Sequence, residues 1–464
     1  MTTQPAYTTD PAYALAGFVA NLTYDRLPAA VISNIKRIIL DVTGTALAGS
    51  SLGAGCREFV QVVAGFGGAP EATVLAHGIK VPAVHAALLN GAISHALNFD
   101  DVFPGGGHLG VVTLPAAYAL AERLGGVDGR EFLTALAAGG EVAARLQLAV
   151  RGADDGTSEA KPQPTQFLGA FAAAATCARL LHLDQTATLS ALGHALMQAS
   201  GNRQPVVQGT TAKALYAAYP NFHGLFSALL AQAGIGAACS VLEGEAGLFP
   251  TAYSNRYVAS CLTDHLGDRF EMEAVAFKPW PTTGRAHVYI EAALDIANTE
   301  TFATGDIEEV VVRGAPYIRT FSEPIEMRRH PRTSIEAEDN VFYGPAKALV
   351  NRAVVLRDFQ PEGLGQPDVD ALGSRMRYEI DAELKGVGVL QVRLADGRVL
   401  GRRVSQPLGS PGNPLSDAQL LAKFYDCATH AIQPIPGARL DRFVELAAHA
   451  EQVDAVELVR ALHP

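Results

Sequence analysis

Residues 95–115 contain two adjacent acids and a histidine in an arrangement that suits acid–base chemistry. Asp100 and Asp101 follow an apolar run with helical spacing, and a glycine-rich loop separates them from His108. Carboxylates at the C-terminal end of a helix face the negative end of its dipole, which disfavours them by a few tenths of a kcal/mol or more. Residues held in an unfavourable place are candidates for function. The alternative is that both acids are solvated loop residues and that His108 lies on the surface.

Two lysines are candidates for holding an anion. Lys213 interrupts a run of small and apolar residues, and Lys278 is flanked by aromatic residues and prolines. A desolvated lysine is suited to bind a carboxylate or a phosphate. Arg285 and His287 follow Lys278 closely and are candidates for the same loop. Taken alone, each lysine is better explained as a side chain whose ammonium group extends to the surface.

The sequence lacks the motifs that are typical of metal-binding and cofactor-binding sites. It contains no HExxH, no pair of histidines four residues apart and no CxxC, which are the usual metal-binding spacings. The glycines at 105–107 are not followed by Lys-Ser/Thr as in a phosphate-binding loop, and no GxGxxG run follows a predicted strand. We therefore expect neither a bound metal nor an organic cofactor.

Composition narrows the class of protein. The chain of 464 residues is 48% apolar, which is enough to build two or three domains. Its net charge of -11, from 36 basic and 47 acidic residues, argues against binding to nucleic acid or to an anionic membrane surface. Five scattered cysteines are typical of reduced thiols in a cytosolic protein. No signal peptide is recognisable and no apolar run reaches the roughly 18 residues of a membrane span, so we expect a cytoplasmic protein.

The elements that must position these residues are mostly helices. Apolar periodicity predicts two helices within 113–150, broken at 125–129, and further helices over 12–22, 29–47, 81–97, 167–182, 185–200, 211–235, 419–430 and 441–462. Runs typical of β-strands predict strands over 71–75, 307–313, 375–380, 389–394 and 399–404. Helical spacing predicts one more helix, over 339–353. The pattern therefore predicts a large helical domain formed by residues 1–267 and 406–464, and a smaller α+β domain formed by residues 268–405.

Six blocks of the sequence, in order, resemble the MmgE/PrpD family over nearly the whole chain. They are LPAAVISNIKRIILDVTGTALAGS, VHAALLNGAISHALNFDD with the following PAAYALAERLGG, AKALYAAYPNFHGLFSALLAQAGIGA, LEGEAGLF, KPWPTTGRAH and GSPGNPLSDAQLLAKF. The resemblance implies a large helical domain built from both chain ends, an α/β lid, a homodimer, and a site between the two domains that needs no metal or organic cofactor.

Positions that match the family's site are Asn98, Val102, His108, Gln163, Lys213 and Lys278. Three of them depart from the family pattern, because Asn98 stands in place of an aspartate, Val102 in place of a threonine and Gln163 in place of a histidine. Tyr216 likewise replaces a histidine. The resemblance therefore implies that the anion-binding residues are kept while part of the acid–base set has changed.

The residues and the resemblance together predict a lyase, either a dehydratase or a decarboxylase, that acts on a di- or tricarboxylic acid. Lys213 and Lys278 would hold a carboxylate of this small anionic substrate. His108 would move a neighbouring proton, since an unperturbed histidine has a pKa of about 6.5. One alternative is an epimerase or isomerase of a similar acid, and another is an inactive family member that acts as a binding protein.

Overall fold

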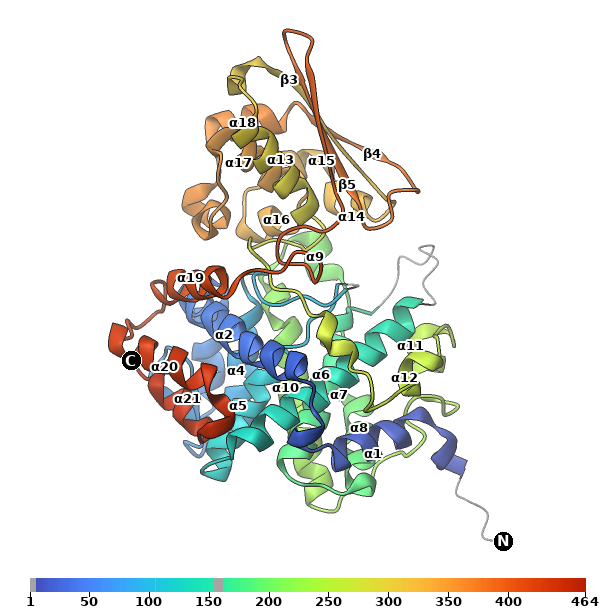
Figure 1. Cartoon of the computed structure of the whole chain (residues 1–464). Helices are drawn as coiled ribbons and strands as arrows, with labels where there is room; N and C mark the ends of the chain where they lie inside the picture. Colours follow the sequence, from blue (N-terminus) through green and yellow to red (C-terminus); the bar gives the residue numbers. More distant parts are fainter. Residues whose placement is uncertain (1–5, 105, 153–161) are drawn as a thin grey trace.

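The computed structural model describes residues 6–104, 106–152 and 162–464. It is 58% helical and 9% strand, with a large helical part and a small α/β part in the C-terminal region. Figure 1 shows the α/β part above the helical part, with α9, α16 and α19 near the level where the two meet. The predicted fold class, mostly helical with a smaller α+β unit, is confirmed.

The helical part takes its elements from both ends of the chain. Its helices are α1 (Pro11–Asn21), α2 (Ala29–Leu52), α3 (Cys56–Ala64), α4 (Ala83–His95), α5 (Leu114–Leu124), α6 (Gly129–Gly152), α7 (Pro164–Leu180), α8 (Gln185–Gln198), α9 (Gln204–Gln208), α10 (Leu215–Gln232), α11 (Leu248–Tyr253), α12 (Ser260–Thr263), α19 (Asp417–Ala428), α20 (Gly437–Ala448) and α21 (Ala455–Ala461). The two-stranded hairpin of β1 (Ala72–Val74) and β2 (Ile79–Val81) and the 3-10 helices η1 (Ala6–Thr9), η2 (Tyr24–Arg26), η3 (Thr211–Ala214), η4 (Glu271–Ala274) and η8 (Ala450–Gln452) complete it.

Two predicted helices are divided in the structure. The stretch predicted over 211–235 begins as the 3-10 helix η3 before α10 starts. The stretch predicted over 441–462 is split between α20 and α21, because Asp454 starts a new helix. Its carboxylate accepts from the backbone N–H of Val456 at 2.9 Å and from that of Val127 at 3.1 Å. A side-chain cap of this kind satisfies the free N–H groups of a helix start and favours a break there.

One hydrophobic core in the helical part joins distant segments of the chain. It extends from Ala12 to Phe277 and resumes at Leu415, so the last three helices pack with the first. A second core lies in the α/β part and extends from Trp280 to Leu400. The two domain boundaries proposed from the sequence are compatible with these clusters and stay predictions.

Close contacts between helices depend on small residues. A Cβ added to Gly224 of α10 would lie 2.3 Å from the Cβ of Ala173 and 2.5 Å from the backbone nitrogen of Ala174 on α7. Atoms of a folded protein do not approach so closely, and a core this dense cannot absorb a methyl group without shifting. Gly224 therefore sets the distance between α7 and α10.

We expect Gly224→Ala to lower the free energy of unfolding by about 1–3 kcal/mol, because the added methyl group overpacks this contact. Alanine is the better helix former, so any loss measures the contact and not helix propensity. Gly236→Ala is the matched control, since nothing lies within 4 Å of its added Cβ. Urea unfolding of both variants tests this; equal stability of Gly224→Ala and wild type would contradict it.

The α/β part is a four-stranded sheet with helices beside it. Its strands are β3 (Ile307–Gly314), β4 (Met376–Ile380), β5 (Gly388–Leu394) and β6 (Val399–Val404), in the order β4-β3-β5-β6. β3 and β4 are parallel and the other neighbours antiparallel. The remaining elements are α13 (His287–Thr299), α14 (Ile318–Ser322), α15 (Ile325–Arg329), α16 (Ser334–Glu338), α17 (Tyr343–Asn351), α18 (Pro367–Gly373), η5 (Thr304–Asp306), η6 (Leu356–Phe359) and η7 (Pro361–Gly363).

The prediction of a helix over 339–353 is wrong at the start of that range. α16 ends at Glu338 and α17 begins only at Tyr343. The side chain of Asn340 causes the break, because its oxygen accepts from the backbone N–H groups of Phe342 at 2.7 Å and Tyr343 at 3.1 Å. Asparagine competes with the helix for backbone hydrogen bonds in this way. As a result, Glu338 and Asp339 lie at a helix end.

Within the described residues, no single helix has the length and apolar character needed to cross a membrane. The bent pair α2 and α3 meets that test only when its two helices, which differ in direction by 90°, are counted together.

Candidate active site

Asp100 joins two histidines at the C-terminal end of α4. Its carboxylate oxygens lie 3.1 Å from Nδ1 of His95 and 2.5 Å from Nδ1 of His108. Nδ1 of His108 also contacts the backbone oxygen of Asp101. Since both neighbours of this nitrogen are acceptors, Nδ1 carries the proton and donates it. The other nitrogen of His108, Nε2, bonds to no described residue and has a free lone pair.

Charge at this cluster is set by burial and by the histidines. Burial raises the pKa of Asp100, but the charges and hydrogen bonds of His108 and His95 outweigh it and hold that pKa well below its usual range. Burial lowers the pKa of His108, and the neighbouring Asp100 only partly offsets this. At neutral pH the pair is therefore an ionised aspartate that orients a neutral histidine, with Nε2 ready to accept a proton.

Asp101 shapes the loop that carries His108. Its carboxylate accepts from the backbone N–H groups of Leu109 at 2.9 Å and Gly110 at 3.0 Å. Burial raises its pKa to about 6. Gln147 of α6, which the sequence pattern does not indicate, supports the same loop with an amide 3.4 Å from the backbone oxygen of His108. Asp101 and Gln147 thus position the histidine.

The alternative of solvated loop acids and a surface histidine is wrong. Asp100 and Asp101 are 0% exposed and His108 is 6% exposed. The surface interpretation of the two lysines is wrong as well, since Lys213 is 4% exposed and Lys278 is 2% exposed. Burying five ionisable side chains costs free energy unless each has a partner, which makes this region a candidate site on physical grounds.

Lys278 is held by Asn98. Its ammonium group donates to the backbone oxygen of Asn98 at 2.8 Å and to the side-chain Oδ1 at 2.7 Å. Asn98 has a left-handed backbone, with φ of 50°, which asparagine adopts more readily than most residues. Burial lowers the pKa of Lys278 to about 8, although Asp100 opposes the change. No described carboxylate forms an ion pair with Lys278, so a bound anion would be its counter-charge.

Lys213 differs from Lys278 because it already has two acidic partners. Its ammonium lies 2.8 Å from Oε2 of Glu338 and 2.8 Å from Oδ2 of Asp339. Burial lowers the pKa of Lys213, but Asp339 and Glu338 outweigh it and raise that pKa above its usual value. Asp339 also accepts from the amide of Asn98 at 3.3 Å. Lys213 thus joins the two parts of the chain, and its role in holding a carboxylate of the substrate stays a prediction.

Lys423 of α19 is a further cation of the site that motifs did not reveal, and its side chain is 7% exposed. Its ammonium donates to Asp41 at 2.6 Å and to the backbone oxygens of Phe99 at 2.6 Å and Lys278 at 2.9 Å. It also lies 3.9 Å from the centre of the Phe99 ring. The C-terminal segment thereby fixes both loops of the site. The only signal in the sequence is a lysine within an amphipathic helix, a pattern that usually marks a solvated face.

Val102 and Arg285 lie on the two segments that meet at this site. The backbone of Val102 forms two hydrogen bonds of 2.8 Å with Ala276, and a Cβ added to Gly284 would lie 3.8 Å from the Val102 side chain. The neighbouring Arg285 lies 4.7 Å above the ring of Tyr317. No described carboxylate forms an ion pair with Arg285. A second cation is thus available to an anion.

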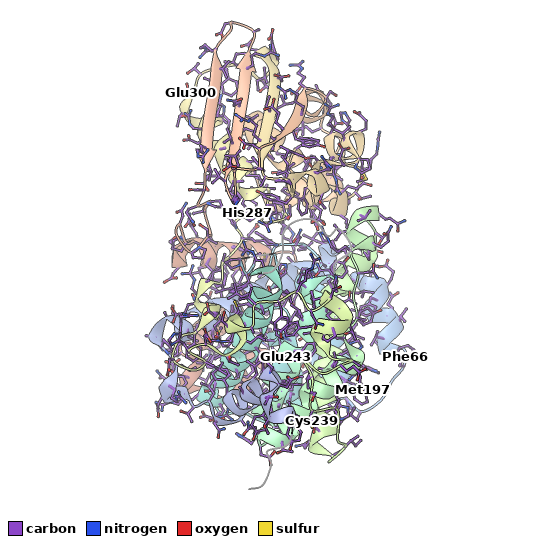
Figure 2. All side chains as sticks on the ribbon, turned by 90° about the vertical axis from the view of Figure 1, so that its right-hand side faces the viewer. Phe66, Met197, Cys239, Glu243, His287 and Glu300 are labelled. Atoms are coloured by element: carbon purple, nitrogen blue, oxygen red, sulfur yellow. The ribbon has the colours of Figure 1, made fainter. Side chains whose placement is uncertain are left out.

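His287 is buried at the base of the α/β part, where Figure 2 shows it above the helical part. Burial lowers its pKa to about 3, and the charges of Lys278 and Lys423 add to this effect. Its Nε2 has no hydrogen-bond partner among the described residues. His287 is therefore neutral at all ordinary pH values and is not a source of positive charge.

Tyr216 and Gln163 form no hydrogen bond with the described residues of the histidine cluster. The hydroxyl of Tyr216 donates to the backbone oxygen of Asn202 at 2.9 Å. Gln163 caps α7 by accepting from the backbone N–H of Thr165 at 2.7 Å. No contact between described residues joins Gln163 to His108, and residues 153–161 before it lie outside the described part. The role of Gln163 in substrate binding stays a prediction.

His95, Asp100 and His108 offer ligand atoms within 4.8 Å of one another, which is close enough to hold a metal ion. Hydrogen bonds from Nδ1–H of His95 and of His108 to the carboxylate of Asp100 also explain why these three side chains lie so close together. We expect dialysis against EDTA to leave the melting temperature and the activity unchanged, because these hydrogen bonds need no ion. A loss of either property that zinc restores, measured on the dialysed protein, would show that the cluster is a metal site.

The chain belongs to the MmgE/PrpD family. The family's N-terminal domain matches residues 13–259 and its C-terminal domain matches residues 280–447. The chain is 27% identical over 448 residues to the cis-aconitate decarboxylase-like protein oryM of Aspergillus oryzae, with 90% of each chain covered. It is 26% identical over 432 residues to cis-aconitate decarboxylase of Homo sapiens, covering 89% of this chain and 86% of that protein. The mouse decarboxylase is 25% identical over 437 residues.

Proposed function

We propose that this protein is a lyase that removes a proton next to a carboxylate of a small di- or tricarboxylic acid. One observation carries the proposal: His108 has a free Nε2 fixed by Asp100, and the buried Lys278 beside this cluster has no carboxylate partner among the described residues. A base and an unpaired cation in one buried place suit a substrate that is itself an anion. The decarboxylase relatives support the same class of substrate.

The chemistry follows from these two groups. Lys278 holds a carboxylate of the substrate, and Arg285, which forms no ion pair with a described carboxylate, holds a second one. His108 Nε2 then takes a proton from the adjacent carbon, while Asp100 stabilises the imidazolium that forms. The positive charge of Lys278 stabilises the negative charge that remains on the substrate after the proton is removed. Loss of a hydroxyl group from the neighbouring carbon, as water, then gives a dehydratase. A decarboxylase differs, because it loses carbon dioxide without this proton removal and its carbon takes up a proton instead.

An epimerase or isomerase of a similar acid is the second candidate, because proton removal by His108 is the first step of that reaction too. Incubating the protein in D2O with a panel of di- and tricarboxylic acids that includes cis-aconitate separates the candidates by NMR. A lyase gives a new compound and water or carbon dioxide, and an epimerase gives a deuterated substrate with an inverted carbon. Binding seen as a thermal shift without any exchange would contradict both, and would leave a binding protein.

We also propose that the protein is a homodimer, as the family resemblance implies. Ring contacts connect Phe66, His85, Phe222 and Phe226 at distances of 6.0–6.5 Å on one side of the helical part. Phe66 is 71% exposed and Phe226 is 40% exposed, and Figure 2 shows Phe66 at the surface. Contiguous exposed apolar groups of this kind mark association sites.

We expect the double variant Phe66→Glu/Phe226→Glu to sediment as a monomer at micromolar concentration, because two buried charges per subunit would face each other across this aromatic surface. Val399→Glu in the α/β part is the control, since Val399 is also highly exposed and lies on β6. A wild-type protein that sediments as a monomer, or a double variant that stays dimeric, would contradict the proposal.

A further inference from the structure

Glu338 and Asp339 bring two acids from the α/β part to a single lysine of the helical part. Glu338 is 1% exposed and Asp339 is 5% exposed. Both carboxylates lie 2.8 Å from the ammonium of Lys213. Three ionisable groups in mutual contact thus carry two negative charges and one positive charge when all are ionised. A buried cluster avoids the uncompensated charge by keeping a proton on one of the acids.

The proton belongs on Glu338, because Asp339 has the better partners for a negative charge. Oδ1 of Asp339 accepts from the amide of Asn98 at 3.3 Å. Burial raises the pKa of Asp339, but Lys213 and Arg328 outweigh it and lower that pKa below its usual value. Burial raises the pKa of Glu338 to about 7, although Lys213 opposes the change. The ionisable groups that face Glu338 are Lys213, Asp339, Lys278 and the buried thiol of Cys56.

The main chain of Glu338 is fixed to the loop that follows Lys278. Its backbone oxygen accepts from the N–H of Thr283 at 2.8 Å and from the hydroxyl of Thr282. This loop continues to Gly284, which lies against Val102. The main chain of Glu338 is therefore fixed to the segment that carries Lys278, in addition to the contact of its side chain with Lys213.

We propose that Glu338 is the second proton carrier of the site and acts as the general acid that complements His108. The proposal rests on the proposed lyase function and names the residue that completes it. Neutralising Lys213 alone would require only one acid, and Asp339 meets that need. A second acid at the same ammonium, fixed through its backbone, is explained by its ability to give and regain a proton.

In a dehydration, His108 Nε2 takes the proton from carbon and the C–H electron pair forms the new double bond. The C–O bond breaks, and the departing oxygen takes the proton of Glu338, so that water leaves. In a decarboxylation, His108 removes no proton from carbon: the C–C bond breaks, carbon dioxide leaves, and the electron pair of that bond stays on the carbon that receives the proton of Glu338. In both cases Glu338 ends as a carboxylate and regains its proton from solvent.

Infrared difference spectra between pH of about 5 and about 9 test the proton without any substrate. We expect the carbonyl band of a protonated, buried carboxylic acid to fade as the pH rises through about 7. Asp101, whose pKa is about 6, should give a second band that fades at lower pH. Glu338→Gln should remove only the band that fades near pH 7, whereas Glu326→Gln, at an exposed acid of α15, should leave both. A band that still fades near pH 7 in Glu338→Gln would overturn the assignment of the proton to Glu338.

Kinetics on any acid that the wild type turns over, cis-aconitate included, test the role. Glu338→Gln keeps the size of the side chain, and we expect it to lower kcat by about 100-fold or more, the ordinary effect of a lost general acid. The fall in wild-type activity that begins near pH 7 should move up to about pH 8 in this variant, where Lys278 loses its proton. Glu338→Asp, which restores a carboxyl group, should recover part of the rate. Wild-type kcat in Glu338→Gln would overturn the proposal.

The two proposals fail in different ways. In a dehydration, deuterium exchange at carbon needs only His108, so Glu338→Gln should still exchange while it forms product about 100-fold more slowly. If His108→Gln also exchanges, the proposed function fails and the role of Glu338 fails with it. If exchange depends on His108 but product formation is unaffected by Glu338→Gln, the lyase stands and Glu338 is only a partner of Lys213. Asp339→Asn provides the comparison, since it should lower stability and keep the fall in activity at high pH.

Discussion

Replacing His108 with glutamine should lower kcat/KM by about 10²–10⁴, the range expected for loss of a general base. Glutamine has similar polarity and can still donate toward Asp100, but it cannot accept a proton from carbon. The position is buried beside Asp100 at 2.5 Å, so the substitution changes the chemistry with little change in volume. The melting temperature should therefore change far less than the rate.

His449→Gln is the matched control, because His449 is exposed at the end of α20. It should keep wild-type activity.

The pH profile adds a second test of the role of His108 as the base. Since the pKa of His108 is lowered, the neutral base persists below the usual histidine range, and activity should fall only at a pH below about 6.5. Near wild-type kcat/KM in His108→Gln would mean that another group removes the proton.

Replacing Lys213 with alanine should lower the free energy of unfolding by about 3–5 kcal/mol at pH 8, the usual cost of breaking a buried ion pair from one side. The lysine is only 4% exposed, so solvent screens little of this effect. Without it, Glu338 and Asp339 would remain buried and unpaired, and Asn98 would lose part of the network that holds Lys278. Activity should fall with stability.

The stability loss of Lys213→Ala should depend on pH in a defined direction. Without the lysine, both carboxyl groups have folded pKa values above their unfolded values of about 4. Such groups favour the folded state when protonated, so the loss should be small near pH 4 and grow as the pH rises. Urea unfolding at several pH values measures it, with Lys385→Ala at an exposed lysine as control. Equal losses at pH 5 and pH 8 would contradict the ion-pair assignment.

The elements that sequence periodicity predicted well are those whose pattern is local. The hairpin between β5 and β6 turns at Gly397, which has a φ of 86°, as the Asp-Gly pair indicated. α8 begins at Gln185 as predicted, since Asp184 caps it through the N–H of Ala187 at 2.8 Å. The motif around Asp100 and His108 was also visible, because the acid, the loop and the histidine are close in sequence.

The features that sequence missed depend on contacts between distant residues. Glu338 and Asp339 were placed at or before a predicted helix, and their importance depends on Lys213, more than a hundred residues earlier. Lys423 serves the site only because α19 packs on α2 and brings the lysine to Asp41. The neighbours of a lysine in sequence do not show whether it has an acidic partner in the fold, so the sequence pattern alone does not distinguish Lys213 from Lys278.

The claim at the centre of this account is that His108 removes a proton next to a carboxylate. The most direct measurement is NMR of deuterium incorporation from D2O into an acid that the wild type turns over, compared between wild type and His108→Gln. We predict that the wild type incorporates deuterium at the carbon beside the carboxylate held by Lys278, and that His108→Gln, still folded, incorporates none. Equal incorporation by both proteins at that carbon would contradict the account.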